Sequence, residues 1–334
     1  MAKKYTDLYT TARNVFANQK YEAGWQSFLT DKCRVTSLMG NDGFSGSHRA
    51  ACEKIRTRIG EEARAPGGPG AALIKASQNA ESPGSLQDRA AALKILKHTY
   101  LVNQGGGQEV WVYAPPKDHA GWMFDEIVGS PEAIQPKLAA ETEIFSQAEM
   151  NWMSFALKLA LRVSEQTRIL VAGKSDATAA VVKRWFLDEG AGDAELADAF
   201  AKLAAGFRDI SGACGSSRLV FTDYPDWRAQ RDKYFGGAIR GGEGGGFPVI
   251  YLEGAFTRLT GNTGKQWLCV ETIIHEFSHH EVRTRDHRYD SSGLRPRKDA
   301  FPYAKAIENA DSWGYFALDA AGYLSDGDRA STWK

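Results

Sequence analysis

The sequence predicts an α+β protein: a mainly helical C-terminal domain that holds a small sheet, preceded by a separate N-terminal α+β region. Three stretches carry apolar residues at helical spacing, 141–163, 177–187 and 194–207. Strand-like runs follow at 218–222 and 247–252, and two further helical stretches lie at 266–282 and 302–324. The change from mixed to helical patterning predicts a domain boundary near 130–140, so we assign residues 1–135 and 136–334 to separate parts.

The N-terminal region has a mixed pattern of its own. A helix is predicted over residues 85–98 and a strand over residues 109–113, which a pair of prolines ends. A new helix is predicted to begin at residues 130–132, because Ser, Pro and Glu there suit the N-cap, the first helical position and the first turn. These elements predict that residues 1–135 form a folded region with strands and helices.

Composition excludes several classes of partner. The chain has 334 residues, of which 43% are hydrophobic, and 41 basic residues balance 41 acidic ones. This zero net charge predicts no nucleic-acid partner and no anionic membrane surface. No apolar run approaches the ~18 residues that span a bilayer, so we expect no membrane span. No apolar stretch follows Lys3 and Lys4, so we also expect no Sec-type signal peptide.

The four cysteines show no metal-site spacing. Cys33, Cys52, Cys214 and Cys269 form no CxxC pair. We expect free, partly buried thiols, since chains without a signal peptide mostly stay reduced. In an oxidising compartment Cys33 and Cys52 could form a disulfide.

Histidines gather near the C-terminal end of the chain. Four of the seven, His275, His279, His280 and His287, fall within thirteen residues. The segment His275-Glu276-Phe277-Ser278-His279 is an HExxH motif, which places two imidazoles on one face of a helix, one turn apart. Both can reach one zinc ion, and Glu276 beside them can serve as the general base of a metallopeptidase. The motif predicts a zincin-like catalytic domain.

A catalytic zinc site needs a third protein ligand. The metzincin pattern requires Gly and His at positions that Val282 and Arg285 occupy here, so it fails. The gluzincin pattern takes a Glu from a later helix, and Glu308 is available. A third pattern takes an Asp shortly after the motif, and Asp286 is available. The residues alone leave Asp286 and Glu308 open.

Two further segments resemble one known family. Residues 284–289, Thr-Arg-Asp-His-Arg-Tyr, and the Asn-Ala-Asp of residues 309–311 follow the HExxH motif in the same order as in the aspzincins, the deuterolysin and peptidyl-lysine metalloendopeptidase group. The resemblance covers roughly residues 145–325. It implies one catalytic Zn²⁺ held by His275, His279 and Asp286, with Glu308 the less favoured ligand. Arg283 and Asp290 stand where the family usually has Gly.

The resemblance also implies catalytic roles and a specificity. Glu276 is the general base and Tyr289 stabilises the oxyanion. Asp311 matches the acid that attracts a basic side chain in the lysine-specific members, so we expect preference for Lys at P1′ of a peptide or protein substrate. Those members carry a second acid where this chain has Gly314. His280 and His287 are interpreted as polar residues that are satisfied by their own neighbours or that support the ligands without binding the metal.

The strand at 247–252 is predicted to be an edge strand that pairs with an extended substrate, as in zincins generally. The glycine-rich run before it, 241–246, is either a mobile lid or a plain linker. Main-chain pairing with this strand would give affinity, and side-chain pockets would give specificity.

Residues 1–135 have three candidate roles: an inhibitory propeptide that contacts the catalytic domain, a delivery module of a bacterial toxin or effector, or an integral part of the catalytic fold. We expect a protein that is secreted or delivered by a route without a classical signal peptide, or that otherwise stays in the cytoplasm or has lost its leader. The alternatives in function are a gluzincin-type peptidase that uses Glu308 and a non-catalytic binding protein that keeps a zincin scaffold.

Overall fold

The computed structural model describes residues 111–112, 114, 117, 144–215, 220–238, 249–262 and 265–334. The chain divides into two compact units. One comprises Met1–Asn151, Ser217–Ala229 and Gly244–Phe247, and the other comprises Trp152–Ser216, Gln230–Glu243 and Pro248–Lys334. The predicted helices at 85–98 and 130–132, the boundary near 130–140 and the glycine-rich run 241–246 lie outside the described residues, as do Cys33 and Cys52.

The first unit contains a parallel strand pair. β1 (Trp111–Val112) pairs with β2 (Val220–Thr222), with Val112 opposite Phe221. Both strands were predicted, at 109–113 and 218–222, and both are confirmed for the residues that the structure describes. A 3₁₀ stretch, η2 (Pro225–Lys233), follows β2.

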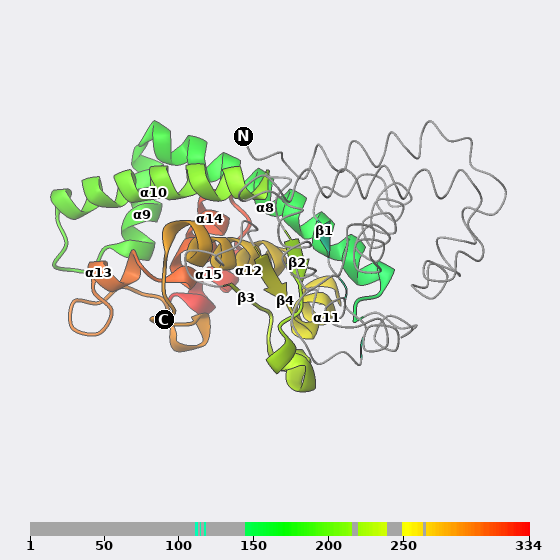
Figure 1. Cartoon of the computed structure of the whole chain (residues 1–334). Coiled ribbons are helices and arrows are strands. Elements are labelled where there is room, and N and C mark those ends of the chain that lie inside the picture. Colours follow the sequence, from blue (N-terminus) through cyan, green and yellow to red (C-terminus); the bar gives the residue numbers. More distant parts are fainter. Residues whose placement is uncertain are drawn as a thin grey trace, which may run out of the picture. The chain divides into compact units, whose positions relative to one another are not determined.

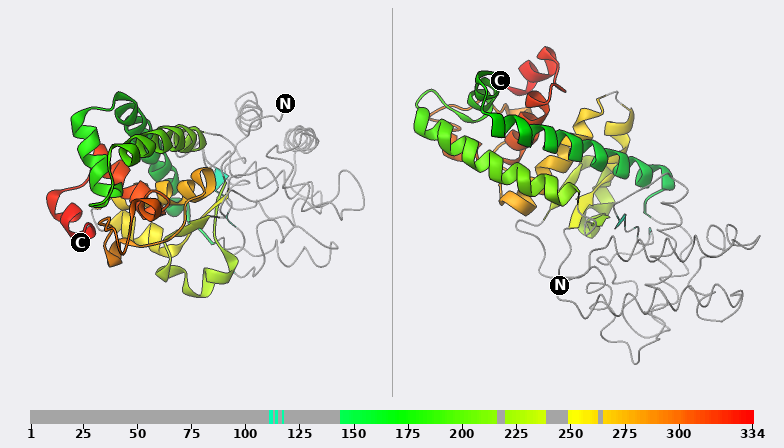
Figure 2. Two further views of the ribbon diagram at one scale, coloured as in Figure 1. Left: turned by 90° about the vertical axis from the view of Figure 1, so that its left-hand side faces the viewer. Right: turned by 90° about the horizontal axis from the view of Figure 1, so that it is seen from above.

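Three long helices open the second unit. They are α8 (Gln147–Gly173), α9 (Asp176–Phe186) and α10 (Asp193–Cys214). The first was predicted to begin at 141, but Ser146 and Glu149 form a reciprocal cap that starts it at 147. The end of α10 lies against α8, since a Cβ atom at Gly215 would be 3.7 Å from Leu161 Cδ1, and the two helices run side by side (Figures 1 and 2).

The sheet of this unit is small. β3 (Gly236–Ala238) pairs antiparallel with β4 (Val249–Leu252), and α11 (Gly254–Asn262) follows. All four residues of β4 are buried, and β3 is the terminal strand of the sheet. The prediction that the strand at 247–252 is the edge strand is therefore wrong: a buried strand cannot offer an open edge, and β3 occupies that position.

The helix that carries the HExxH motif changes its pitch in its last turn. α12 (Trp267–Phe277) is α-helical, and η3 (Ser278–Val282) continues it as a short π-helix. The predicted helix over 266–282 is thus confirmed, apart from the wider final turn. η3 ends at Arg283, whose φ of 66° is left-handed.

The prediction of one helix over 302–324 is wrong. The structure has α13 (Tyr303–Ala306), a break at residues 307–309, and α14 (Ala310–Ala320). The backbone leaves the helical pattern because Glu308 and Ala310 hydrogen-bond to Arg285 of another segment. Two short elements complete the chain, the 3₁₀ turn η4 (Asp290–Ser292) and α15 (Asp326–Thr332).

The core of the second unit forms around α14. Every residue from Ala310 to Asp319 is buried, and the helix packs against α12, α9 and η3. Trp313 contacts Phe186 and Phe207 through ring faces and edges. Because α14 is enclosed on all sides, the side chains at its N-terminal end are held rigidly beside α12.

A buried carboxylate ties three helices together at the other end of α14. Asp319 accepts hydrogen bonds from Arg184 at 2.6 Å, from Trp185 Nε1 at 2.8 Å and from Arg329 at 2.8 Å. These donors come from α9 and α15, so a buried charge is satisfied by two cations and an indole. The network fixes α14 along its length.

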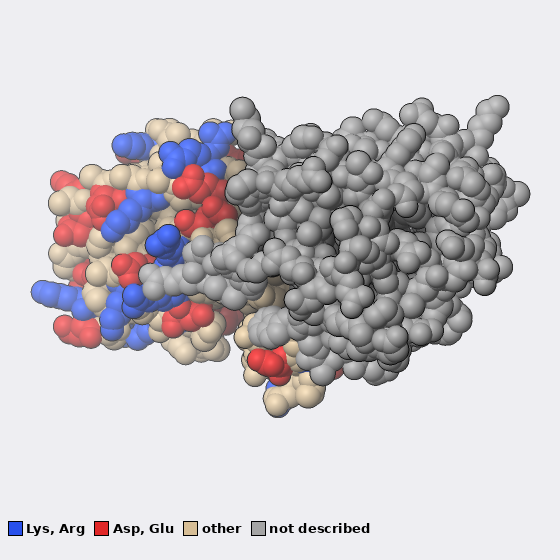
Figure 3. Space-filling model, in the orientation of Figure 1, with Lys and Arg blue, Asp and Glu red and all other residues tan. Residues whose placement is uncertain are grey.

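None of the described helices is long and apolar enough to cross a membrane. On the face shown in Figure 3, lysines and arginines of the described residues are interspersed with aspartates and glutamates. Cys214 and Cys269 are free and buried, as expected, and burial raises the pKa of Cys269 to about 12. These two thiols are therefore uncharged structural side chains.

Candidate metal centre

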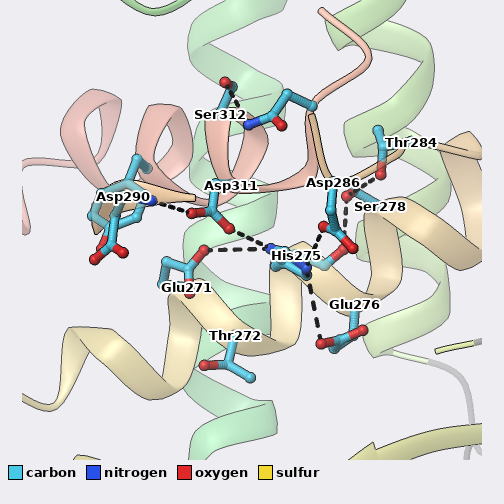
Figure 4. A network of polar contacts seen from close by, with 12 residues as sticks. Glu271, Thr272, His275, Glu276, Ser278, Thr284, Asp286, Asp290, Asp311 and Ser312 are labelled. Carbon is cyan, nitrogen blue, oxygen red and sulfur yellow. Dashed lines mark hydrogen bonds and ion pairs between the residues drawn. The ribbon is translucent and has the colours of Figure 1, made fainter. Parts of the chain in front are cut away.

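Three side chains converge on one point beside α12. The Nε2 atoms of His275 and His279 are 3.1 Å apart, and each lies 3.2 Å from Asp286 Oδ1. Both imidazole side chains are 10% exposed, while Asp286 reaches the site from the loop after η3 (Figure 4). Two groups of His and acidic side chains among the described residues have ligand atoms close enough to hold one metal ion: these three, and Glu271 with His275 and Asp311.

The opposite nitrogen of each ring determines how it faces this point. His275 Nδ1 is 2.7 Å from Asp311 Oδ1, and His279 Nδ1 is 3.0 Å from the carbonyl oxygen of Thr284. Because these acceptors have no proton to give, each Nδ1 carries a hydrogen, which leaves each Nε2 as the nitrogen that can bind an ion when its own proton is displaced. The two Nε2 atoms and a carboxylate oxygen face one another, an arrangement that one cation can bridge.

The separations suit zinc. Ligands 2.0–2.1 Å from a tetrahedral ion lie about 3.3 Å from one another, close to the 3.1 and 3.2 Å found here. Burial of Asp286 favours its neutral form, but hydrogen bonds with His275 and His279 outweigh burial and hold the pKa of Asp286 below its usual value. The third ligand therefore stays charged.

The backbone brings Asp286 back to the helix within a short span. The π-helix η3 is followed by left-handed Arg283, and Thr284 N–H then donates to Ser278 O at 3.2 Å. The hydroxyls of Ser278 and Thr284 are 2.6 Å apart. Arg283 adopts a φ that a glycine would adopt without strain, at a cost of about 1–2 kcal/mol. The π-helical turn and the left-handed Arg283 therefore allow the chain to bring Asp286 back to the histidines within seven residues of His279.

Glu276 lies beside this group. Its Oε1 is 4.0 Å from His275 Nε2, the residue is 4% exposed, and its Oε2 accepts no hydrogen bond from the described residues. Burial raises the pKa of Glu276. β3 passes close by, since a Cβ atom at Gly236 would be 3.3 Å from Glu276 Oε1. The carboxylate therefore lies between the histidines and the edge strand.

Comparison with known proteins bears on this arrangement. Residues 171–318 match the family model described as lysine-specific metallo-endopeptidase, the aspzincins. This part of the chain is an aspzincin domain. The family consists of metalloendopeptidases, which hydrolyse peptide bonds, so peptides and proteins are its substrate class. The match confirms the resemblance drawn from the two short segments, and no curated protein matches the chain.

Tyr289 stands at the open side of the aspzincin site. Its ring stacks on that of His275, with centroids 6.5 Å apart and planes 11° apart, and the residue is 52% exposed. Partial burial and the charge of Asp286 raise the pKa of Tyr289 to about 12. Its hydroxyl therefore keeps its proton at neutral pH and can donate a hydrogen bond.

Asp311 lies against His275, on the side away from the convergence point. Its Oδ1 contacts His275 Nδ1, and its Oδ2 accepts the backbone N–H of Asp290 at 2.7 Å (Figure 4). Both carboxylate oxygens thus have partners within the protein. Sequence reasoning assigned Asp311 to substrate, whereas its contacts orient a histidine of the convergent group.

The other predicted residues lie outside this group. Glu308 is 60% exposed in its side chain, and its Oε2 is 3.8 Å from His287 Nε2. His280 Nδ1 is 2.7 Å from Glu281 Oε1. Neither contact includes His275 or His279, so the geometry favours Asp286 over Glu308. His280 agrees with its interpretation as a satisfied polar residue. The same interpretation of His287 is not supported, because its buried Nε2 has no hydrogen-bond partner among the described residues.

Sequence reasoning missed three contributors. Glu271 is one helical turn before His275, and its Oε1 is 3.8 Å from His275 Nδ1. The carbonyl of Thr284 orients His279, and Asn309 contacts the loop that carries Asp286. The i, i+4 spacing of Glu271 to His275 could have indicated the first. Asn309 belongs to the Asn-Ala-Asp segment, but its contact with the loop, like that of the Thr284 carbonyl, depends on backbone positions that no side-chain pattern reveals.

Proposed function

We propose that this chain is a zinc-dependent endopeptidase in which His275, His279 and Asp286 hold one catalytic Zn²⁺. The convergence of two imidazole Nε2 atoms and a carboxylate oxygen on one point carries this proposal. The aspzincin match to residues 171–318 supports it independently. Bound there, zinc supplies Lewis-acid chemistry that activates water at neutral pH.

The chain's own residues then perform the proton transfers. Glu276 accepts a proton from the attacking water and passes it to the nitrogen of the leaving amine. Its raised pKa suits both steps, because a carboxyl group with a pKa closer to neutrality both takes up and releases the proton readily. The Tyr289 hydroxyl donates a hydrogen bond to the oxygen of the scissile carbonyl as negative charge develops on that oxygen.

The edge strand suits substrate binding. β3 has one edge paired with β4 and ends its sheet, and it runs past Glu276. An extended peptide that pairs with this edge brings its main chain alongside the catalytic carboxylate. The predicted pairing of substrate with an edge strand is thus kept, with β3 in place of the strand at 247–252.

A preference for Lys at P1′ follows from charge. Asp290 and Asp311 lie on the outer side of His275, and in the described part of the chain neither forms an ion pair with a lysine or arginine. Glu271 lies beside them, but burial raises its pKa well above the usual value, so the charge comes from the two aspartates. A Cβ atom at Gly314 would be 2.7 Å from Glu271 Oε1, so the absent side chain leaves the space that this carboxylate fills. The negative charge favours a basic P1′ side chain of the substrate near His275. Asp311 contributes its charge only, because both of its carboxylate oxygens already have partners in the protein.

The proposal is tested by digesting a set of peptides with the full chain, with zinc and with a chelator. We expect chelator-sensitive cleavage before Lys, and none by Glu276→Gln, which keeps the ligands but lacks the base. Cleavage that survives chelation, or that Glu276→Gln retains, would contradict the zinc mechanism. Cleavage without bias at P1′ would contradict only the lysine preference.

A further inference from the structure

The side chain of Asn309 does not cap the helix it precedes. Asn309 is the N-cap residue of α14, and an N-cap asparagine usually accepts a hydrogen bond from the first turn of its own helix. Here no such bond exists. Asn309 Oδ1 instead accepts the backbone N–H groups of His287 at 2.9 Å and Arg288 at 2.8 Å. The asparagine is fully buried, so its acceptor is committed to this other segment.

The backbone reinforces the same attachment. Arg285 N–H donates to Glu308 O at 2.7 Å, and Ala310 N–H donates to Arg285 O at 3.0 Å. Together with the two bonds to Asn309 Oδ1, four hydrogen bonds join residues 285–288 to residues 308–310. Asp286 lies inside the attached segment.

Burial cannot hold Asp286 in place. Arg285 and Asp286 are both exposed, and 35% of the surface of the Asp286 side chain is accessible to solvent. A ligand on an exposed loop must be positioned by backbone contacts, because no core packing restricts it. The attachment to Asn309 supplies these contacts, from a helix that is itself buried over ten residues.

The same segment reaches a second ligand. Two residues after Asn309, Asp311 contacts His275 Nδ1 at 2.7 Å. Residues 309–311 therefore contact the loop of one convergent side chain and the ring of another. Since both contacts start from the rigid first turn of α14, they fix the distance between Asp286 and His275.

We propose that Asn309 is a positioning residue that sets the place of Asp286 for metal binding. The inference rests on the proposed zinc site. Asn309 Oδ1 holds the 287–288 backbone, and this holds the Asp286 carboxylate within reach of His275 and His279. Loss of a hydrogen bond that holds a metal ligand in place typically weakens metal binding by about 10–100-fold.

The test compares three variants of the full chain. Asn309→Ala removes the acceptor. Asn309→Asp keeps an acceptor oxygen but loses the amide donor, which contacts Ser312 Oγ at 3.1 Å. Ser312→Ala removes only that second contact and is the matched control. The measurements are the zinc dissociation constant by competition with a chromophoric chelator, the visible spectrum of the Co²⁺-loaded protein, and the melting temperature without metal.

We expect Asn309→Ala to weaken zinc binding by ~10–100-fold and to alter the Co²⁺ spectrum. Ser312→Ala should stay within about threefold of wild type, and Asn309→Asp should bind more tightly than Asn309→Ala. Wild-type zinc affinity and an unchanged spectrum in Asn309→Ala would overturn the inference. If Asn309→Ala does not fold, Asn309→Asp decides the question, because it keeps the acceptor oxygen. Zinc binding by Asn309→Asp that is weaker than wild type by about 10-fold or more would then overturn the inference. If the wild-type protein binds zinc but does not cleave peptides, the proposed function is wrong, whereas the inference about Asn309 can still be tested through zinc affinity.

Discussion

At the scale of single residues, Gly236 is a point where β3 passes near the Glu276 carboxylate. A Cβ atom there would lie 2.8 Å from the carbonyl oxygen of Tyr251 and 3.3 Å from Glu276 Oε1. Gly236→Ala must therefore displace either β3 or Glu276. We expect kcat/KM to fall by at least ~10-fold, since small misplacements of reacting groups are costly. Zinc content should be unchanged, and a variant with wild-type kcat/KM would refute the close approach.

Tyr289 is the donor whose loss should affect the rate more than binding. Tyr289→Phe keeps the ring that stacks on His275 but lacks the hydroxyl. A lost oxyanion donor typically costs about 10²–10³-fold in kcat, so we expect a decrease of that order with little change in KM or in zinc affinity. Steady-state kinetics on one peptide measure both constants. Retention of more than half the wild-type kcat would exclude Tyr289 as the donor.

The residues of the convergent group could be predicted from the sequence because their spacing is local. His275, Glu276 and His279 share one helical turn, and Asp286 is seven residues further along. The role expected for Asp311 could not be checked in this way, since its partners His275 and Asp290 are set by the packing of α14 on α12. Asn309 Oδ1 accepts backbone N–H groups of another segment, and Thr284 orients His279 through its backbone carbonyl. A side-chain pattern does not show which backbone groups will lie opposite.

At the scale of elements, α10 packs on α14 through a glycine. A Cβ atom at Gly206 would lie 2.4 Å from two ring carbons of Trp313, whereas one at Gly212 of the same helix would meet nothing within 4 Å. We expect Gly206→Ala to lower the free energy of unfolding by about 1–3 kcal/mol through overpacking. Gly212→Ala, the matched control, should raise it by about 0.5–1 kcal/mol through helix propensity.

Urea unfolding of these two variants measures both effects. They share one substitution and one helix and differ only in what surrounds the added methyl group. If both variants are stabilised, α10 does not approach Trp313 as closely as the structure shows. If both are destabilised, Gly212 has contacts that the structure does not show.

Helices with a strong apolar pattern were predictable, and the places where one segment pairs with another were not. The stretches at 177–187 and 194–207 correspond to α9 and α10, although α10 continues to Cys214. The stretch at 302–324 has a continuous helical pattern, yet it breaks at 307–309 because Arg285 takes backbone hydrogen bonds there. β3 escaped prediction because Gly236 and Gly237 have low strand propensity, and their pairing with β4 outweighs it.

At the scale of the whole molecule, the aspzincin match covers residues 171–318, so the activity belongs to the C-terminal part of the chain. Three predictions about the rest remain predictions: that residues 1–135 act as a propeptide, a delivery module or part of the catalytic fold, that the protein is secreted or delivered as a toxin or effector, and that no nucleic acid is a partner. Zinc-dependent cleavage of the chain near residues 130–145 would favour the propeptide.

Zinc should also stabilise the folded chain as a whole. The ligands come from α12, η3 and the following loop, so their convergent arrangement exists only in the folded state, and an ion that binds this state alone stabilises it. At a free zinc concentration of 1,000 times Kd the gain is about 4 kcal/mol. We expect a chelator to lower the melting temperature by several degrees and added zinc to restore it. Glu276→Gln should respond as wild type does, since it keeps every ligand and cannot digest itself, whereas His275→Ala should not respond. An equal response in His275→Ala would mean that the stabilising ion binds elsewhere, and would contradict the assignment of His275, His279 and Asp286 as the metal site.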